Sequence, residues 1–190
     1  MKIVCISQVY WPDTASVAQH LVDLLQALSD HGHDVTVITS RHNYEHPEII
    51  YPAVEYCNGV RIYRIFNTGF GKRTKLGRLA DFLSFNVLIM CRLLALRRSA
   101  CDVMLGLTSP PLLSYIGIKI ARMKKIRFVY WTMDLQPELS MVAGYIKTDA
   151  TPAKVMQKCG DYIFSHSDKI IVLDDYMKRH ISERLHTDEM

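Results

Sequence analysis

The chain has 190 residues, 49% of them hydrophobic, which is enough to bury the core of one large domain and excludes a disordered chain. Lys and Arg number 23 and Asp and Glu 19, and the resulting net charge of +4 does not indicate a nucleic-acid partner. Five scattered cysteines form no Cys-x-x-Cys pair and have no His at ligand spacing, so we expect neither a disulfide framework nor a metal site. This usage fits a reducing, cytoplasmic setting, and the N-terminus shows no signal-peptide pattern.

The N-terminal stretch predicts a β-α-β unit. Residues 2–7 predict the first strand, because the run 3–6 is wholly apolar, which is typical of a strand buried on both faces in a parallel sheet. The spacing of apolar residues predicts a helix over 17–28, with Asp13 or Thr14 as its N-cap. Residues 34–39 then predict the second strand.

The rest of the chain continues this alternation after an irregular stretch at 41–58, and loops of that length are usually functional or mobile. Strands are expected over 59–65, 102–107, 128–132 and 169–173, and helices over 76–98, 112–124, 152–165 and 174–185. Strands that alternate with helices predict an α/β fold, a doubly wound Rossmann-like domain with a mainly parallel sheet of six to seven strands.

The stretch RFVYWTMDLQPE at 127–138 places a carboxylate directly after a short interior strand. Ligands bind at the carboxyl ends of strands in open α/β sheets, so we expect Asp134 to face an acceptor cleft. Thr108 and Ser109 follow the preceding strand and are expected beside Asp134. The alternatives are structural: Asp134 orders the turn or caps a helix, and Ser109 caps the helix that starts at the two following prolines.

The loop after the first strand lacks the glycines that a dinucleotide-binding loop needs for close approach of the pyrophosphate. Its helix should still offer free N–H groups around Ala15 and Ser16 to an anion. Tyr10 and Trp11 offer flat faces to a sugar or lipid, or form a lid packed on the sheet end. Arg41 could bind the 2′-phosphate of NADP, but the missing glycine motif speaks against a reductase.

Positive charge concentrates between residues 72 and 98, where seven bases stand against one acid. The apolar run inside this window is barely long enough to span a bilayer and is interrupted by Asp81, Asn86 and Arg92, so we do not expect a transmembrane helix. Either protein covers this helix, or it lies in a membrane interface with its bases toward anionic headgroups. The bases expected to face the membrane are Lys72, Arg73, Lys75 and Arg78. Cys91, within the apolar run, is expected to be buried.

Several short stretches, in order along the chain, together resemble the N-terminal half of family 4 glycosyltransferases of the GT-B fold, especially those that build bacterial surface polysaccharides on lipid carriers. They are Tyr10-Trp11-Pro12, Gly32-His33-Asp34-Val35-Thr36-Val37-Ile38-Thr39, Asn43-Tyr44 with Tyr51-Pro52, Asn58-Gly59-Val60-Arg61-Ile62, Thr108-Ser109-Pro110-Pro111, Asp134-Leu135 with Pro137-Glu138, and Asp168-Lys169-Ile170-Ile171-Val172.

The resemblance implies a retaining, metal-independent, hexosyltransferase-like transfer of a sugar from a nucleotide sugar to a saccharide or lipid-linked acceptor, without another cofactor. It implies that Asp134 acts on the acceptor hydroxyl and that Glu138 supports the turn. The acceptor-binding set would be Tyr10, Trp11, Asn43, Tyr44, Thr108, Ser109 and Glu138, and Thr14, Ala15 and Ser16 would face the donor phosphate.

The sequence departs from the family pattern in three ways. Ala15-Ser16 stands where many members carry glycine, and Met133 stands where many have a His before the Asp. The third is that residues 1–190 provide the N-terminal Rossmann domain, and no donor-binding C-terminal domain follows Met190. We therefore expect the chain alone to be inactive and to need that domain in cis or in trans. The rival interpretation is a non-catalytic, membrane-associated Rossmann-like module, and in either case the protein is expected in the cytoplasm or on the inner face of the membrane.

Overall fold

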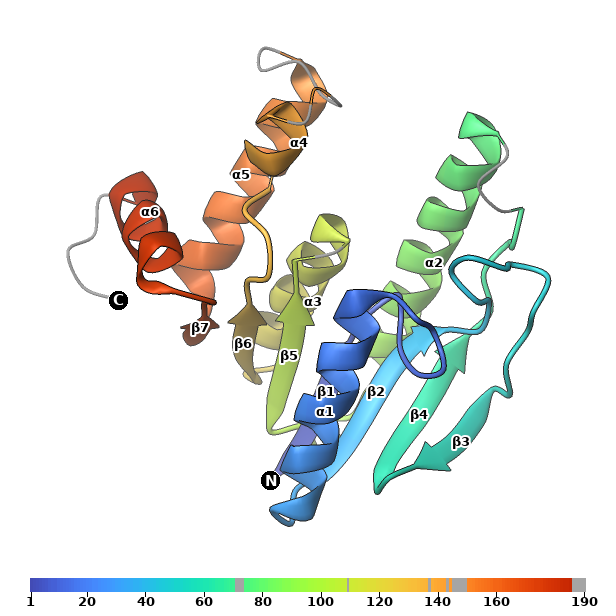
Figure 1. Cartoon of the computed structure of the whole chain (residues 1–190). Helices are drawn as coiled ribbons and strands as arrows, with labels where there is room; N and C mark the ends of the chain where they lie inside the picture. Colours follow the sequence, from blue (N-terminus) through green and yellow to red (C-terminus); the bar gives the residue numbers. More distant parts are fainter. Residues whose placement is uncertain (71–73, 109, 137, 143, 145–149, 186–190) are drawn as a thin grey trace. The chain divides into compact units, whose positions relative to one another are not determined.

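The computed structural model describes residues 1–70, 74–108, 110–136, 138–142, 144 and 150–185 (Figure 1). The fold is α/β, with seven strands assigned to one sheet in the order β3-β4-β2-β1-β5-β6-β7. The strand pairs are parallel except β3 with β4, among those whose register is known. The predicted fold class is therefore confirmed. The chain divides into two compact units, residues 1–104 and 105–190.

Unit 1 contains the predicted β-α-β start and the strands that extend it. Its elements are β1 (Lys2–Ile6), α1 (Ser16–Asp30), β2 (Asp34–Ser40), β3 (Val54–Cys57), β4 (Val60–Ile65), α2 (Lys75–Ala95) and the short 3-10 turn η1 (Arg98–Ala100). β1 is buried after its first residue, as expected for a strand covered on both faces. Helices α1 and α2 provide that cover from opposite faces of these strands (Figure 1).

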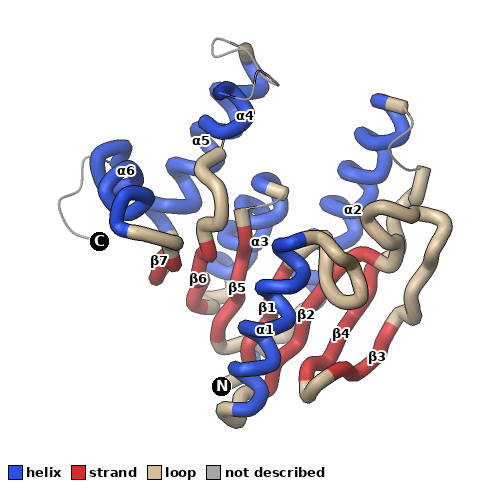
Figure 2. Tube along the Cα trace, in the orientation of Figure 1, coloured by secondary structure: helices blue, strands red, loops and turns tan. Residues whose placement is uncertain are grey.

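The sequence suggested that the whole stretch at 41–58 is irregular, but part of it forms a strand. Val54–Cys57 forms β3, an edge strand that pairs antiparallel with β4 (Figure 2). The turn between them uses positive φ angles at Asn58 (48°) and Gly59 (76°), the geometry of a two-residue hairpin. β3 was missed because its side chains are exposed or half-buried, so it carries no apolar run.

The start of α1 also differs from the prediction. Its N-cap is Ala15, with no side-chain capping hydrogen bond, and neither Asp13 nor Thr14 caps it. Asp13 instead accepts a hydrogen bond from the backbone N–H of Tyr44, at 3.0 Å. Asp13 has a side chain that can cap a helix, but it binds a loop that is distant in sequence. A local sequence pattern does not reveal such a contact.

Helix α2 ends at Ala95, a little before the predicted end. Thr74 caps its first turn by accepting from the Gly77 N–H. One face packs into the core through Phe85, Ile89 and Leu93, all fully buried. Cys91 was expected to be buried but is exposed. Some residues of the apolar run therefore do not face the core.

Unit 2 consists of most of β5 (Val103–Leu107), then α3 (Pro111–Met123), β6 (Arg127–Trp131), α4 (Glu138–Val142), α5 (Thr151–His166), β7 (Lys169–Ile171) and α6 (Asp175–Leu185). β6 and β7 pair in parallel. Helices α3 and α5 pack together, and the Lys119 ammonium of α3 lies 3.8 Å from the ring centre of Tyr162 in α5. The short helix α4 was not predicted, because five residues give no helical period.

Arg64 in β4 is a buried cation whose side chain is 1% exposed. Its guanidinium donates to the Glu55 carboxylate and to the Trp11 carbonyl oxygen, and it lies 4.9 Å from the ring centre of Tyr51. The nitrogen that donates to Glu55 also donates to the Pro52 carbonyl oxygen, at 3.4 Å. One side chain therefore ties the loop after β1 and the segment before β3 to the sheet.

Replacing Arg64 by Met should lower the free energy of unfolding by about 2–4 kcal/mol, because two carbonyls and one carboxylate lose a buried donor. Arg61→Met is the matched control on the same strand. Its guanidinium donates to the Tyr56 hydroxyl in an exposed pair, so little change is expected. Urea unfolding of both variants measures the difference, and equal stability would contradict a central role for Arg64.

Candidate functional site

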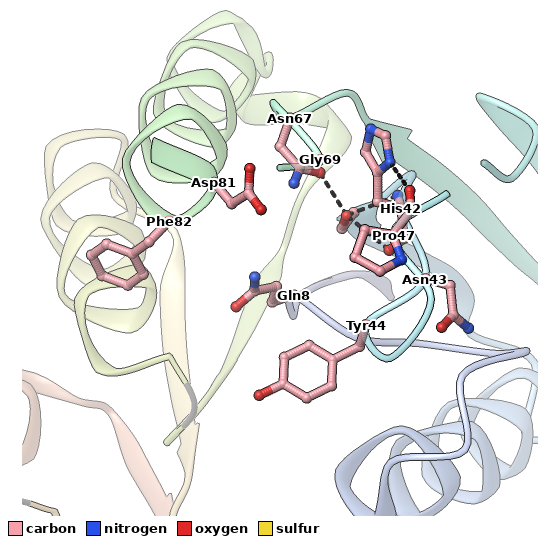
Figure 3. A pocket seen from close by; sticks show the side chains of 10 residues that line it. Gln8, His42, Asn43, Tyr44, Pro47, Asn67, Gly69, Asp81 and Phe82 are labelled. Atoms are coloured by element: carbon pink, nitrogen blue, oxygen red, sulfur yellow. Dashed lines mark hydrogen bonds between the residues drawn. The ribbon is translucent and has the colours of Figure 1, made fainter. Parts of the chain in front are cut away.

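A pocket of about 390 Å³ opens in unit 1 where β1, β2 and β4 reach their carboxyl ends (Figure 3). It is lined by Gln8, Ser40, His42, Asn43, Tyr44, Pro47, Asn67, Gly69, Asp81 and Phe82. The strands contribute the residues at or just after their ends, and α2 contributes the last two. The position agrees with the general rule that open α/β sheets bind ligands at this edge.

Hydrogen bonds between strand ends fix one wall of the pocket. The Ser40 hydroxyl donates to the Asn67 side-chain oxygen at 2.7 Å and accepts from the His42 N–H at 3.0 Å. Ser40 and Asn67 are 7% and 4% exposed. Buried polar groups that are paired in this way hold one geometry, so the wall is preorganised.

The His42 imidazole is held from several sides. Its Nδ1 lies 2.6 Å from the Pro47 carbonyl oxygen, which can only accept, so Nδ1 carries the proton. Phe66 packs edge-on against the ring. A Cβ at Gly69 would lie 2.5 Å from the ring, so glycine is needed there for close approach. Nε2 is buried with no partner among the described residues.

The loop after β2 is shaped by Asn43. Its side-chain oxygen accepts from the N–H groups of Glu45 and His46, at 2.9 and 2.7 Å, and its NH₂ donates to the Tyr51 hydroxyl. This is an Asx-type turn, so most of the hydrogen-bonding capacity of Asn43 serves the loop. The loop in turn carries Tyr44 at the pocket, and this residue is 43% exposed.

The middle of the pocket is polar and has aromatic borders. Figure 3 shows the Gln8 amide between Tyr44 on one side and α2, with Asp81, on the other. Among the described residues, the Gln8 side-chain amide has no hydrogen-bond partner. Asp81 accepts from the Thr68 hydroxyl and from the Phe70 N–H, at 2.8 and 2.9 Å. Amides, hydroxyls and one carboxylate beside aromatic rings are suited to a polyhydroxylated ligand.

Asp134 lies in unit 2, just after β6, and is half-buried. The buried Thr108 hydroxyl accepts from the Met133 N–H at 2.9 Å and lies 3.5 Å from the Asp134 N. The sequence placed Thr108 beside Asp134, and the structure confirms this neighbourhood. The hydroxyl shapes the turn that presents the carboxylate.

Glu138, four residues later, begins α4 and forms an ion pair with Arg184 of α6 at 2.7 Å. Arg184 also binds the Asp161 carboxylate at 2.7 Å and the Gln157 carbonyl at 3.0 Å. The second carboxylate oxygen of Glu138 is buried without a partner among the described residues. Glu138 therefore ties the start of α4 to α6 through Arg184, and its roles in the turn and in acceptor binding stay predictions.

The other predicted site residues differ from one another in burial and position. Tyr10 is 3% exposed, so its ring packs inside unit 1, as in the alternative that the sequence left open, and offers no free flat face; Trp11 is 41% exposed. Thr14 is exposed, and Ala15 and Ser16 stand at the start of α1, which has no acid in its first turn. Ser109, Lys72 and Arg73 lie outside the described residues, and Lys75 and Arg78 belong to the first turn of α2.

The sequence model of Glycosyltransferase Family 4 matches residues 17–189, which is most of the chain and includes parts of both units. The chain belongs to Glycosyltransferase Family 4. A comparison with curated proteins returned no match.

Family 4 membership makes this a glycosyltransferase domain. No cluster of His, Cys, Asp and Glu able to hold a metal ion occurs among the residues described. Within the same residues, no helix is both long and apolar enough to cross a bilayer.

Sequence reasoning missed Gln8, Asn67 and Asp81 as pocket residues, and it noted His42 only as part of a loop. The first two follow β1 and β4, so the rule that identified Asp134 applies to them as well. Amides were passed over because they do not ionise. Asp81 was interpreted only as an interruption of an apolar helix.

Burial raises the pKa of Asp13, and this exceeds the lowering by the N–H groups of Tyr44 and Tyr10 and by Arg64. A raised pKa means that ionised Asp13 costs stability, so its contribution is best below its usual pKa and declines as pH rises through the raised value. Asp13→Asn keeps an acceptor for Tyr44 and should raise the melting temperature at neutral pH, with the gain shrinking in acid. Thermal melts across this range test it; a destabilised variant at neutral pH would contradict it.

Proposed function

We propose that this chain is the acceptor-binding half of a retaining glycosyltransferase, which moves a sugar from a nucleotide sugar to a saccharide acceptor in cell-surface polysaccharide synthesis. The acceptor is lipid-linked. The donor is held mainly by a C-terminal Rossmann domain, in cis or in trans, and no metal takes part. The proposal rests on Family 4 membership together with the polar, aromatic-bordered pocket of unit 1.

The chemistry of the pocket supports a neutral sugar as its ligand. Its volume of about 390 Å³ lies within the range of small-molecule sites. The Gln8 amide offers a donor and an acceptor, and Tyr44 offers an aromatic face on which the apolar face of a sugar can pack. The Ser40, Asn67 and His42 wall is fixed before binding, so little ordering is required when the ligand enters.

In the proposed reaction the Asp134 carboxylate takes the proton of the acceptor hydroxyl while that oxygen bonds to the anomeric carbon of the donor sugar. The bond from this carbon to the donor phosphate oxygen breaks, the nucleotide leaves with the electron pair, and attack from the face that it leaves retains the configuration. The Thr108 hydroxyl holds the backbone of this turn, and the Arg184 ion pair with Glu138 holds the segment after it. Thr14, Ala15 and Ser16 at the start of α1 are the proposed contacts to the donor phosphate, through backbone N–H groups at a helix N-terminus.

Gln8→Ala should weaken the binding of an acceptor oligosaccharide by roughly tenfold, since it removes from the pocket an amide that has no partner among the described residues. Gln157→Ala is the control, because it removes an exposed amide from α5. Calorimetric or NMR titration of a panel of cell-surface oligosaccharides measures the effect. If both variants bind like the wild type, the pocket is not the acceptor site.

Asp134→Asn should lower turnover by about 10²–10⁴-fold, because the amide cannot take the proton of the hydroxyl. The assay uses the chain together with a donor-binding domain, and Asp23→Asn, an exposed carboxylate on α1, is the control. Circular dichroism checks that both variants fold. Wild-type turnover in Asp134→Asn would reduce Asp134 to a residue that orders the turn.

A non-catalytic, membrane-associated module is the second candidate, favoured by the exposed apolar residues of α2. The two candidates separate in one experiment. An interaction module binds no saccharide and supports no sugar transfer with any donor-binding domain supplied. The acceptor half of an enzyme binds a saccharide and supports transfer when its donor-binding domain is supplied.

A further inference from the structure

A second pocket of unit 1, of about 260 Å³, lies toward the opposite edge of the sheet from the candidate site. Helix α2 connects the two (Figure 1): its first half contributes Asp81 and Phe82 to the candidate site, and its end contributes Arg92 and Leu96 to the second pocket. The other lining residues come mostly from β1, β2 and β4 and are Lys2, Val4, Asp34, Thr36, Ile38, Arg61, Tyr63 and Ala100. This pocket, called here the basic pocket, shares no lining residue with the candidate site.

The strand register brings the polar side chains of the basic pocket together. Lys2 of β1 pairs with Asp34 of β2, and Thr36 of β2 pairs with both Val4 of β1 and Arg61 of β4. Alternate residues of a strand point to the same face of the sheet, so Asp34 and Thr36 share one face. These side chains therefore stand on three hydrogen-bonded strands, which fix their spacing.

Tyrosine rings position the two arginines of the basic pocket. Arg61 donates from Nε to the Tyr56 hydroxyl at 2.6 Å, and its guanidinium carbon lies 5.3 Å from the centre of the same ring. The guanidinium carbon of Arg92 lies 5.0 Å from the ring centre of Tyr63. Neither guanidinium forms an ion pair with a described residue. Their terminal N–H groups are therefore available to a ligand, and the ring contacts reduce the ordering that binding requires.

Positive charge exceeds negative charge in the lining of the basic pocket. Lys2 is its third base, and the Lys2 ammonium donates to the Ser99 carbonyl oxygen at 2.8 Å. Asp34 is the one acid among the described lining residues. Asp102 stands outside the lining and accepts from the backbone N–H of Lys2 at 2.7 Å. Three bases against one acid leave a surplus of two positive charges, which favours a dianionic ligand.

We propose that the basic pocket binds the phosphate group of a small phosphate monoester. Such a group carries a charge of about −1.5 to −2 at neutral pH, which matches the surplus. Guanidinium groups pair with phosphate oxygens through two parallel hydrogen bonds, and the Thr36 hydroxyl adds a neutral donor. The volume is several times the roughly 30 Å³ that one water occupies, so the pocket has room for an oxyanion. This site is separate from the proposed acceptor and donor contacts and does not rest on the proposed function.

The test is an NMR titration of the isotope-labelled full chain with inorganic phosphate at about pH 8, where phosphate is a dianion. Saturable shifts are expected for the backbone amides of 34–36, 61–63 and 92–96. Arg61→Met and Arg92→Met should each weaken binding by about tenfold, because each removes charge-assisted hydrogen bonds to phosphate. The control Arg122→Met removes an exposed base from the last turn of α3 and should bind like the wild type.

Asp34→Asn should have the opposite effect. It removes the one described acid of the lining, so phosphate should bind about threefold more tightly. A variant that fails to fold cannot bind more tightly, so this result is independent of stability. Acetate, a monoanion, should bind the wild type more weakly than phosphate does.

Equal binding by the arginine variants and the wild type would overturn the proposal, as would an Asp34→Asn variant that binds phosphate no more tightly. Shifts confined to residues 14–17 would assign phosphate to the donor contacts of the proposed function and would overturn it as well. Circular dichroism melts check that each variant folds. Gln8→Ala should bind phosphate like the wild type, so failure of the acceptor site and failure of the basic pocket give different results.

Discussion

The buried guanidinium of Arg64 is the interaction on which the candidate site depends. A cation removed from water must be surrounded by acceptors, and Arg64 finds them in Glu55 and in the carbonyls of Trp11 and Pro52. These acceptors belong to the loop after β1, to the segment before β3 and to β3 itself. The same two connections deliver Gln8 and the His42 to Pro47 residues to the pocket, so the need to compensate one charge also sets the shape of the site.

Polar residues in the two units serve different purposes, although both groups stand at the carboxyl ends of strands. In unit 1 the polar groups of Ser40, Asn67 and Asn43 mostly hydrogen-bond within the wall of the pocket and its loop. The Gln8 amide is the group that can bind a ligand. In unit 2 Thr108 fixes the backbone of the turn that carries Asp134. Preorganisation of this kind is what a transferase requires, because the donors and acceptors are in place before the substrate arrives.

Much of the site could be predicted by position and little by role. The rule of strand carboxyl ends located Asp134 and placed Thr108 beside it, because parallel neighbouring strands end at one edge. Tyr10 and Asn43 show that position does not predict role. Tyr10 is buried, and the side-chain oxygen of Asn43 accepts hydrogen bonds within its own loop. Aromatic and amide side chains have several uses of similar energy, and long-range packing decides among them. The sequence left the exposure of α2 open between two interpretations for the same reason, since an apolar run is typical of both a core and a membrane interface.

The sequence by itself determined the alternation of strands and helices, the mainly parallel sheet and the carboxylate after β6. Burial of a strand on both faces produces an apolar run, and the end of the strand is visible as the residues that follow this run. The edge strand β3, the capture of Asp13 by Tyr44, the Arg64 contacts and the pocket were decided only by tertiary structure. Each of these joins residues that are distant in sequence, and the free energy of such contacts comes from burial and pairing, which no local pattern records.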